Sequence, residues 1–334
     1  MWELRNRTPF AVDRTVVVDP HGEKHYVVVI KGTFDLEGTV HPQVAEEQLP
    51  PTLAPIYRGE DGESSLIYEQ DLIAAKPKTD IYLNATAHAP KGRPTTEVIV
   101  GLRTPAGEKS LRIRGDRTWE RTIVGQLEPS HPTPFTSLPI TYERAYGGFD
   151  KKDPDPSKHR LAPQNPVGTG LHTKRAHLLG EPVPNVEHLD GPTDQAPAGY
   201  GAVCSYWKPR VDFQGTYDAA WVESQKPLLP KDYDPRVLQC APSDQQTSPH
   251  LRGRERIGLV NMSPSGTILF EVPQHYFGLQ TTIGTKTTEH RANINTLIIE
   301  PDESRVIVVW HSTLSCHHEI DNIDYTLIRE KRYV

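Results

Sequence analysis

The residues best suited to chemistry lie near the C-terminus, in the cluster Cys316-His317-His318-Glu319, with His311 upstream. Thiolate and imidazole groups are ligands that zinc and other borderline metal ions prefer. Neighbouring side chains on a strand point to opposite faces, however, so His317 and His318 are poorly placed to share one ion. No second cluster with ligand spacing accompanies this one. We therefore expect no metal-binding residue, while the sequence leaves open a site near Cys316, His317 and His318.

A second candidate is the segment Tyr142–Asp150, YERAYGGFD, which places acidic, basic and aromatic side chains around a glycine pair. If the segment is extended, the neighbours Glu143 and Arg144 point to opposite faces, which does not suit paired acid–base work. Gly147 and Gly148 permit positive φ angles or a close backbone approach, and the flanking rings indicate a tightly packed loop. The segment favours a structural or binding role over catalysis.

Other motifs with possible chemistry are incomplete. The acidic stretch 60–63 lacks the residue order and the distal glutamate of a calcium loop, and we interpret it as an exposed turn before a strand at 65–68. Residues 165–170, NPVGTG, lack the lysine of a P-loop and indicate a tight turn. There is no GxSxG nucleophile elbow. We predict no catalytic residue and no cofactor.

The elements that must position these residues are mainly strands. The runs 10–19 and 25–36 are rich in Val, Ile and Thr and flank a Pro- and Gly-containing turn, which predicts a hairpin. The same pattern predicts a hairpin of 80–89 with 95–103, in which apolar and polar residues alternate along 80–89 as in a sheet with one buried face. A strand at 109–115 is expected to pair with 95–103 across the turn 104–107, and hairpins are expected for 256–262 with 267–272 and for 295–300 with 305–313, each across a Pro-containing turn. The fold class is therefore mainly β, an antiparallel sandwich-like or paired-sheet body.

The middle of the chain has a different character. Between about residues 125 and 252, Pro, Gly, Asn and His recur every few positions, yet large aromatic residues are too frequent for disorder. We predict an ordered, irregular region fastened to the β core by its rings, with few short helices. One helix is expected at Asp218–Ser224, capped by Asp218 and stopped by Pro227. The chain 1–334 is expected to form one interlocked domain, with sub-regions 1–124, 125–252 and 253–334.

Composition excludes several classes of function. The 37 Lys and Arg residues and 43 Asp and Glu residues give a net charge of −6, which provides no basic field for nucleic acid. The longest apolar runs are far shorter than the roughly 20 residues of a membrane span. The N-terminus lacks the apolar block of a signal peptide, so we expect a cytoplasmic protein with no membrane partner. Cys204, Cys240 and Cys316 are widely spaced and odd in number, which indicates reduced thiols.

An ordered series of motifs resembles a known family. It comprises KGTFDL (31–36), PIYRGEDGESSLIYEQDL (55–72), KTDIYLNATAHAPKGRP (78–94), GDRTW (115–119), PITYERAYGGFD (139–150), NPVGTG, PVPNVE (182–187), WKPR with GTYDAAW, and TLIIEPDESRVIVVWHS (296–312). The series is similar to the proteins of unknown function that accompany type VI secretion genes. The resemblance implies a chaperone or adaptor that carries a toxic effector to a VgrG-type spike protein. It implies no catalytic residue. The chain ends at Val334 without an appended effector, PAAR-like or pentapeptide module, so we expect an adaptor that acts as a separate protein.

The binding surface of such an adaptor is expected in the central region, because interfaces favour Tyr, Trp and Arg as anchors. The candidate residues are Tyr142, Glu143, Arg144, Tyr146, Gly147, Gly148, Trp207, Arg210, Tyr217 and Trp221. The alternative for each ring is that it only pins a loop to the core. Pairing of a partner strand with an exposed sheet edge is a second route to binding.

Two other classes of function remain open from the sequence. One is an enzyme for a small or carbohydrate substrate, with Glu143, Glu187 or Asp218 converging in space. The other is a structural accessory subunit of the secretion apparatus.

Overall fold

The Val- and Ile-rich runs at the two ends of the chain pair with each other in the largest sheet. Strands β3 (Lys24–Asp35) and β25 (Arg305–Ser315) are antiparallel neighbours along their whole length, from Arg305 opposite Asp35 to Ser315 opposite His25. The computed structural model describes residues 2–36, 38–190, 197–316 and 320–331. In these residues the sheet has the order β19 (Gln246–Thr247), β7 (Thr79–Leu83), β24 (Asn293–Glu300), β25, β3 and β2 (Ala11–Val18), and β4 (Gln43–Val44) also pairs with β3.

This large sheet is covered on both faces, which explains its near-continuous apolar strands. Along β3, Val28 and Ile30 face one hydrophobic cluster, whereas Val27 and Val29 face another. Strand β7 is buried along its whole length, so the expectation of one solvent-facing side for this strand was wrong. The second cluster lies under the irregular central region, which supplies the cover that the sequence pattern did not reveal.

A second sheet packs against the first cluster. Its order is β18 (Val186–His188), β10 (Gly107–Arg114), β9 (Glu97–Thr104), β20 (Arg256–Val260) and β21 (Thr267–Glu271). Alternate residues such as Val98, Val100 and Leu102 of β9 face the core that this sheet shares with the large sheet. The mainly β fold with mostly antiparallel, paired sheets is confirmed.

Four hairpins expected from the sequence are present, and one is not. The pairs β2–β3, β9–β10, β20–β21 and β24–β25 are antiparallel, as predicted. The predicted strand 80–89 is instead divided: β7 ends at Leu83 and runs parallel to β24, while β8 (Thr86–His88) pairs with β13 (Ser137–Pro139). The break falls at Asn84, whose side-chain amide donates to Glu300 and to the carbonyl of Ile67. The expected 80–89 and 95–103 hairpin was therefore wrong.

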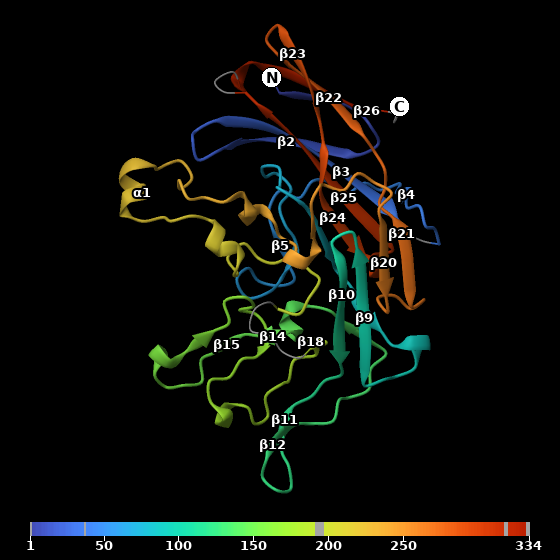
Figure 1. Cartoon of the computed structure of the whole chain (residues 1–334), viewed down its shortest axis with the longest axis vertical. Helices are drawn as coiled ribbons and strands as arrows, with labels where there is room; N and C mark the ends of the chain where they lie inside the picture. The colour runs from blue at the N-terminus through green and yellow to red at the C-terminus, as the bar shows by residue number, and fades with distance from the viewer. Residues whose placement is uncertain (1, 37, 191–196, 317–319, 332–334) are drawn as a thin grey trace.

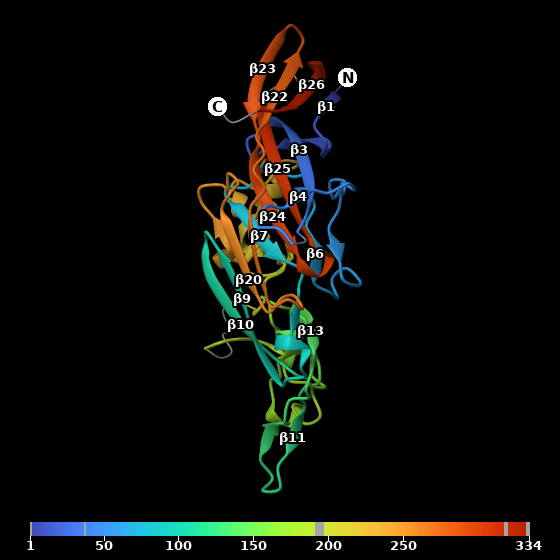
Figure 2. The same ribbon diagram turned by 90° about the vertical axis from the view of Figure 1, so that its right-hand side faces the viewer.

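A third sheet extends from one end of the molecule, where both termini lie (Figure 1). It has the order β1 (Glu3–Arg7), β26 (Ile323–Glu330), β22 (Phe277–Ile283) and β23 (Lys286–Arg291), with β1 parallel to β26. At the opposite end the hairpin of β11 (Trp119–Arg121) and β12 (Leu127–Pro129) projects from the body, as the second view also shows (Figure 2). The molecule is therefore elongated, with a β-hairpin at one end and a small sheet at the other.

The described part of the central region is built from short elements, as expected. Besides β8, β11, β12 and β13, the short strands outside the three sheets in the described residues are β5 (Ile56–Tyr57), β6 (Leu66–Tyr68), β14 (Tyr146–Gly147), β15 (Phe149–Asp150), β16 (Arg160–Leu161) and β17 (Thr169–Gly170). The 3₁₀ turns found in the described part of the chain are η1 (Pro90–Gly92), η2 (Tyr142–Arg144), η3 (Pro156–Lys158), η4 (Arg175–His177), η5 (Arg210–Phe213), η6 (Pro235–Leu238), η7 (Ser243–Gln245), η8 (Pro301–Glu303) and η9 (Ile320–Asn322).

The expected helix is present as α1 (Ala219–Ser224), where the Asp218 carboxylate accepts a hydrogen bond from the backbone N–H of Trp221. This is the capping interaction that the sequence predicted. Among the described residues, no helix is long and apolar enough to cross a bilayer. Cys204, Cys240 and Cys316 are buried as thiols, which agrees with the expectation of reduced thiols.

Candidate binding site

The YERAYGGFD segment holds the central region in place through its hydrogen bonds. Its first residues form the 3₁₀ turn η2, so Glu143 and Arg144 do not lie on an extended stretch, whereas the later residues are extended in β14 and β15. The Glu143 carboxylate accepts hydrogen bonds from the backbone N–H and hydroxyl of Ser65, at 2.7 and 3.0 Å. Burial tends to raise the pKa of Glu143, but these hydrogen bonds hold it below its usual value. Arg144 donates instead to Asp116 and Asn185, at 3.2 and 3.1 Å.

The glycine pair meets the predicted NPVGTG turn. Gly147 and Gly148 both have positive φ angles, 156° and 107°. A Cβ atom on Gly147 would lie 2.2 Å from the carbonyl oxygen of Asn165, and one on Gly148 would lie 2.5 Å from that of Gly168. The Asn165 amide in turn donates to the carbonyls of Tyr142 and Tyr146. The two motifs thus lock together, and only glycine fits their close backbone approach.

Trp207 and Arg210 are also buried and make their contacts in the protein interior. The fully buried Trp207 ring packs edge-to-face against Tyr142, with 5.4 Å between ring centroids. Buried Arg210 donates to the Glu69 carboxylate at 2.7 Å and to two backbone carbonyls. Burial tends to lower the pKa of Arg210, but the charge of Glu69 raises it above its ordinary value. Trp207 therefore supports a surface from beneath and does not itself reach a partner.

Tyr217 and Trp221, in contrast, lie on a projecting loop. We call residues 214–234 the arm; it carries α1 and stands away from the sheets (Figure 1). The Tyr217 and Trp221 rings pack edge-to-face at 4.8 Å, while 53% of Tyr217 and 55% of Val222 remain exposed. The Gln225 amide fixes the arm to the body by donating to the carbonyl of Pro20. The arm thus presents exposed apolar side chains, Tyr217 and Val222, beside the partly exposed Trp221, on a supported element.

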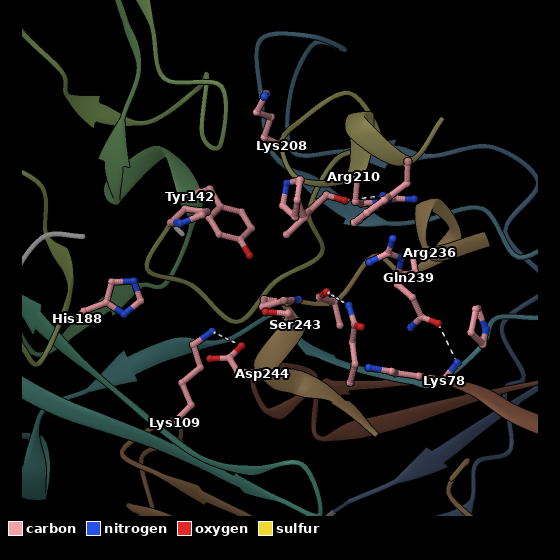
Figure 3. Close-up of a pocket in the computed structure, with 18 residues that line it drawn as sticks. Lys78, Lys109, Tyr142, His188, Lys208, Arg210, Arg236, Gln239, Ser243 and Asp244 are labelled. Atoms are coloured by element: carbon pink, nitrogen blue, oxygen red, sulfur yellow. Dashed lines mark hydrogen bonds and ion pairs between the residues drawn. The ribbon is translucent and has the colours of Figure 1, made fainter. Parts of the chain in front are cut away.

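A cavity of about 420 Å³ opens at the base of the arm (Figure 3). Its walls come from β10, β18, β19, the turns η2, η5, η6 and η7, the residue after η6, and the segment before β7. Its apolar lining consists of Pro77, Tyr142, Pro197, Val203, Pro209, Phe213, Ala241 and Pro242. The volume falls within the range of ligand pockets, roughly 300–1,000 Å³.

The charged groups around this cavity are mostly cationic. Lys78, Lys109, Lys208, Arg210 and Arg236 line it, and the carboxylate among the lining residues is that of Asp244. Lys109 donates to Asp244 at 3.1 Å and to Gln245 at 3.0 Å. Burial lowers the pKa of Lys109, and the charge of Asp244 opposes that shift. This cationic group was missed in the sequence analysis, because its members are separated by up to 158 positions, from Lys78 to Arg236.

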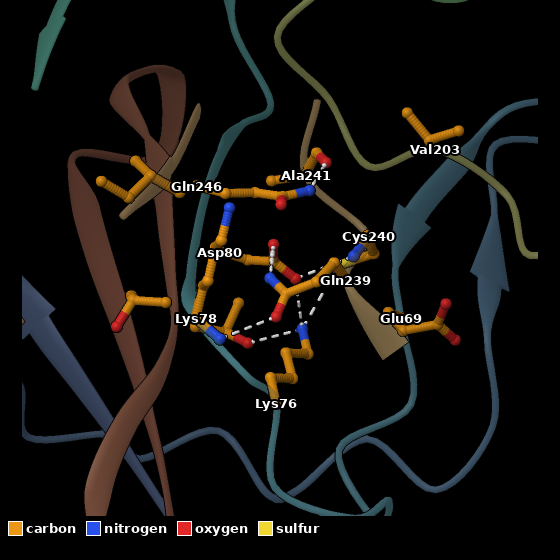
Figure 4. A network of polar contacts seen from close by, with 12 residues as sticks. Glu69, Lys76, Lys78, Asp80, Val203, Gln239, Cys240, Ala241 and Gln246 are labelled. Carbon is orange, nitrogen blue, oxygen red and sulfur yellow. Dashed lines mark hydrogen bonds and ion pairs between the residues drawn. The ribbon is translucent and has the colours of Figure 1, made fainter. Parts of the chain in front are cut away.

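A buried polar network holds the floor of the cavity (Figure 4). The Lys76 ammonium group donates to Asp80 at 2.7 Å and to the Thr296 hydroxyl at 2.9 Å. Asp80 also accepts from the Gln239 amide and from the backbone N–H of Cys240. Gln239 lines the cavity and accepts from the backbone N–H of Lys78. The network therefore ties β7 and β24 of the large sheet to the cavity wall.

The acids proposed for an enzyme have separate partners. Glu143 binds Ser65, Glu187 pairs with Arg117 at 2.5 Å, and Asp218 caps α1. None of the three is among the residues that line the cavity within the described part of the chain. The geometry does not bring them together as an acid–base pair.

The residues proposed for metal binding fall into two groups. His317, His318 and Glu319 lie outside the described residues. His311 donates from Nε2 to the carbonyl of Asp71 at 2.6 Å and lies on the opposite face of the large sheet from Cys316, which belongs to the first hydrophobic cluster. Within the described ranges, no group of three His, Cys, Asp or Glu side chains is arranged to hold a metal ion.

The burial of His311 leads us to predict that the folded protein becomes less stable at acidic pH. Burial lowers the pKa of His311 to about 4, whereas an unfolded histidine titrates near about 6.5. Between these two pH values the unfolded chain binds a proton that the folded chain does not. The free energy of unfolding therefore falls as the pH decreases from about 6.5 to about 4. The loss from this group is roughly 3 kcal/mol. Urea unfolding across this range is expected to show a shallower pH dependence for His311→Gln than for the wild type. An unchanged slope for His311→Gln would contradict this assignment.

A comparison with known protein families identifies the family of this chain. The family model described as "Uncharacterized protein conserved in bacteria (DUF2169)" matches residues 21–311. The chain belongs to this family. The DUF2169 match covers the whole central region and most of both β regions, and it includes every residue that lines the cavity and the whole arm. Neither the curated proteins nor the solved structures include a significant match to the chain.

Proposed function

We propose that this protein is a non-enzymatic adaptor that binds a type VI secretion effector in the cytoplasm and helps to load it onto a VgrG-type spike. The proposal rests first on the ordered motifs that resemble proteins accompanying type VI secretion genes. The structural feature that supports the proposal most strongly is the arm, where Tyr217 and Val222 are about half exposed on a loop fixed to the body. Exposed rings on a supported element are typical of binding hot spots.

The division of the candidate residues supports the same function. Tyr142, Trp207 and Arg210 hold the central region on the large sheet, and Glu143, Arg144, Gly147 and Gly148 fix its path. This rigid base limits the entropy that the arm loses when a partner binds. Partly buried Tyr146 belongs to the base as well. The proposed contact residues are therefore Tyr217, Trp221 and Val222.

The first test is to capture partners with tagged protein from the cytoplasm of its native bacterium and to identify them by mass spectrometry. Recovery of a toxin encoded by a neighbouring gene, with or without a spike protein, is the expected result. If an extract in which that toxin is demonstrably present yields no specific partner, the adaptor function is wrong.

The arm is expected to carry a large share of the affinity. The double substitution Tyr217→Ala and Val222→Ser should weaken effector binding at least about tenfold, since a hot-spot ring contributes roughly 2 kcal/mol or more. The melting temperature should change little, because both side chains are about half exposed and neither belongs to the buried core. Binding can be measured by titration calorimetry with the recovered effector. Leu269→Ala is the matched control, since Leu269 is 62% exposed on β21, in a different sheet; equal losses for the two variants would count against the arm.

A further inference from the structure

The cavity at the base of the arm combines an apolar lining with cationic groups. Figure 3 shows these side chains around an open centre, with Asp244 beside Lys109. We propose that this cavity binds an extended acidic segment of the protein partner, in which a large apolar side chain fills the cavity and flanking Asp or Glu residues meet its cationic groups. This inference rests on the proposed adaptor function and specifies the chemistry of the partner.

The cationic groups differ in their availability to a ligand. Arg210 is committed to Glu69, and both side chains are buried. Lys109 is nearly buried beside Asp244. Lys208 and Arg236, however, form exposed ion pairs with Asp212 and Asp234. Exposed pairs of this kind contribute about 0–1 kcal/mol, so a ligand carboxylate can replace the acidic partner at little cost.

Lys78 is the most available of these groups. It is exposed at the cavity, and no acidic partner for its side chain occurs among residues 2–36, 38–190, 197–316 and 320–331. Its backbone is held by Gln239, which is itself fixed by Asp80. The buried network thus positions a cation without neutralising it, and this arrangement favours an anionic ligand.

The apolar part of the lining indicates what accompanies the negative charge. Phe213, Val203 and the proline rings of Pro77, Pro209 and Pro242 form walls on several sides of the cavity. Such surfaces gain little from a bare inorganic anion, but they stabilise a buried aliphatic or aromatic side chain. An apolar residue flanked by carboxylates satisfies both parts of the site.

The position of the cavity favours a protein segment over a free metabolite. Turns η5 and η6 form the two roots of the arm, and they are joined by a hydrogen bond from the N–H of Asp234 to the carbonyl of Phe213. Phe213 and Arg236, one from each root, also line the cavity. A partner resting on the arm therefore has part of its surface beside the opening.

The test uses rhodamine-labelled peptides and the full-length protein. Each peptide in the probe mixture has one central residue, which is Leu, Phe, Tyr or Trp, and two acidic residues on each side of it. Fluorescence anisotropy should show saturable binding that weakens at least tenfold when Asn and Gln replace the acids, and also when Ala replaces the apolar residue. Equal binding of the acidic and neutral peptides, or no saturable binding, would overturn the proposal. Complete displacement by millimolar inorganic phosphate in a buffer of constant ionic strength would also overturn it, because the site would then be one for small anions.

Charge-reversal variants test whether the peptide binds at the cavity. Lys78→Glu and Arg236→Glu should each weaken peptide binding at least tenfold, whereas Lys286→Glu, on the distant strand β23, should not. Both substituted side chains are exposed, so the fold is expected to be retained, as unchanged circular dichroism would show. Equal effects of the three variants would refute binding at the cavity.

Effector capture separates the two proposals. If the acidic peptides bind in a Lys78-dependent manner but no effector is recovered, the cavity assignment stands and the adaptor function fails. If the effector is recovered equally well by the wild type and by Lys78→Glu, the adaptor function stands and the cavity assignment fails.

Discussion

Asp80→Ala is expected to destabilise the protein by about 3–5 kcal/mol, one of the largest effects of any single substitution in this chain. Asp80 is fully buried and accepts hydrogen bonds from Lys76, Gln239 and the backbone of Cys240. Burial tends to lower the pKa of Lys76, but the charge of Asp80 holds it above its usual value, so Lys76 is charged in the fold. Removal of Asp80 leaves that charge buried without a counter-ion, which is strongly unfavourable. Chemical denaturation of the purified variant measures the loss.

Two further variants test this explanation. The double variant Lys76→Met and Asp80→Ala removes both charges and should be more stable than Asp80→Ala alone, because no unpaired charge remains. Asp212→Ala breaks the exposed pair with Lys208 and should cost no more than about 1 kcal/mol. If the double variant is less stable than Asp80→Ala, the penalty arises from lost packing and not from the isolated ammonium group.

Trp207→Ala is expected to cost about 3–5 kcal/mol, since it empties a fully enclosed site between the central region and the large sheet. The ring packs against Tyr142 and belongs to the hydrophobic cluster that contains Val27, Val29 and Ile307. Because η2 and η5 both rest on this contact, the central region should become more susceptible to proteolysis than the sheets. Thermal unfolding together with limited trypsin digestion provides the two measurements.

Trp207→Phe is the matched control, because it keeps most of the buried ring and should cost less than half as much as the alanine substitution. A Trp207→Ala protein with wild-type stability and reduced effector binding would contradict the buried role assigned to this residue. Such a result would show that Trp207 reaches the partner directly.

The sequence predicted the parts of the fold that depend on local patterns. Strand composition and turn residues located the β2–β3, β20–β21 and β24–β25 hairpins, and the Asp218 cap located α1. These features depend on neighbours only a few residues away. The parallel contact between β7 and β24 was missed, because it joins residues more than 200 positions apart.

The candidate site was predicted only in part, for the same physical reason. Aromatic residues identified the region that is anchored to the sheet, but their types do not reveal whether a ring faces the core, as Trp207 does, or solvent, as Tyr217 does. The cavity was missed because Lys78, Lys109 and Arg236 come from three separate segments. Only the folded arrangement of β7, β10 and η6 places these charges around one space.

The pairing of β3 with β25 has a consequence for how the protein is made. Ribosomes release β3 early, yet Asp35 and its partner Arg305 are separated by 305 − 35 = 270 positions. At roughly 5–20 residues per second, β3 waits about 15–55 s for its neighbour to be synthesised. Throughout that interval the nascent chain carries an apolar strand with one unpaired edge, which is prone to aggregation. The large sheet therefore cannot be completed until β25 has been synthesised, and truncation before residue 305 is expected to yield insoluble protein.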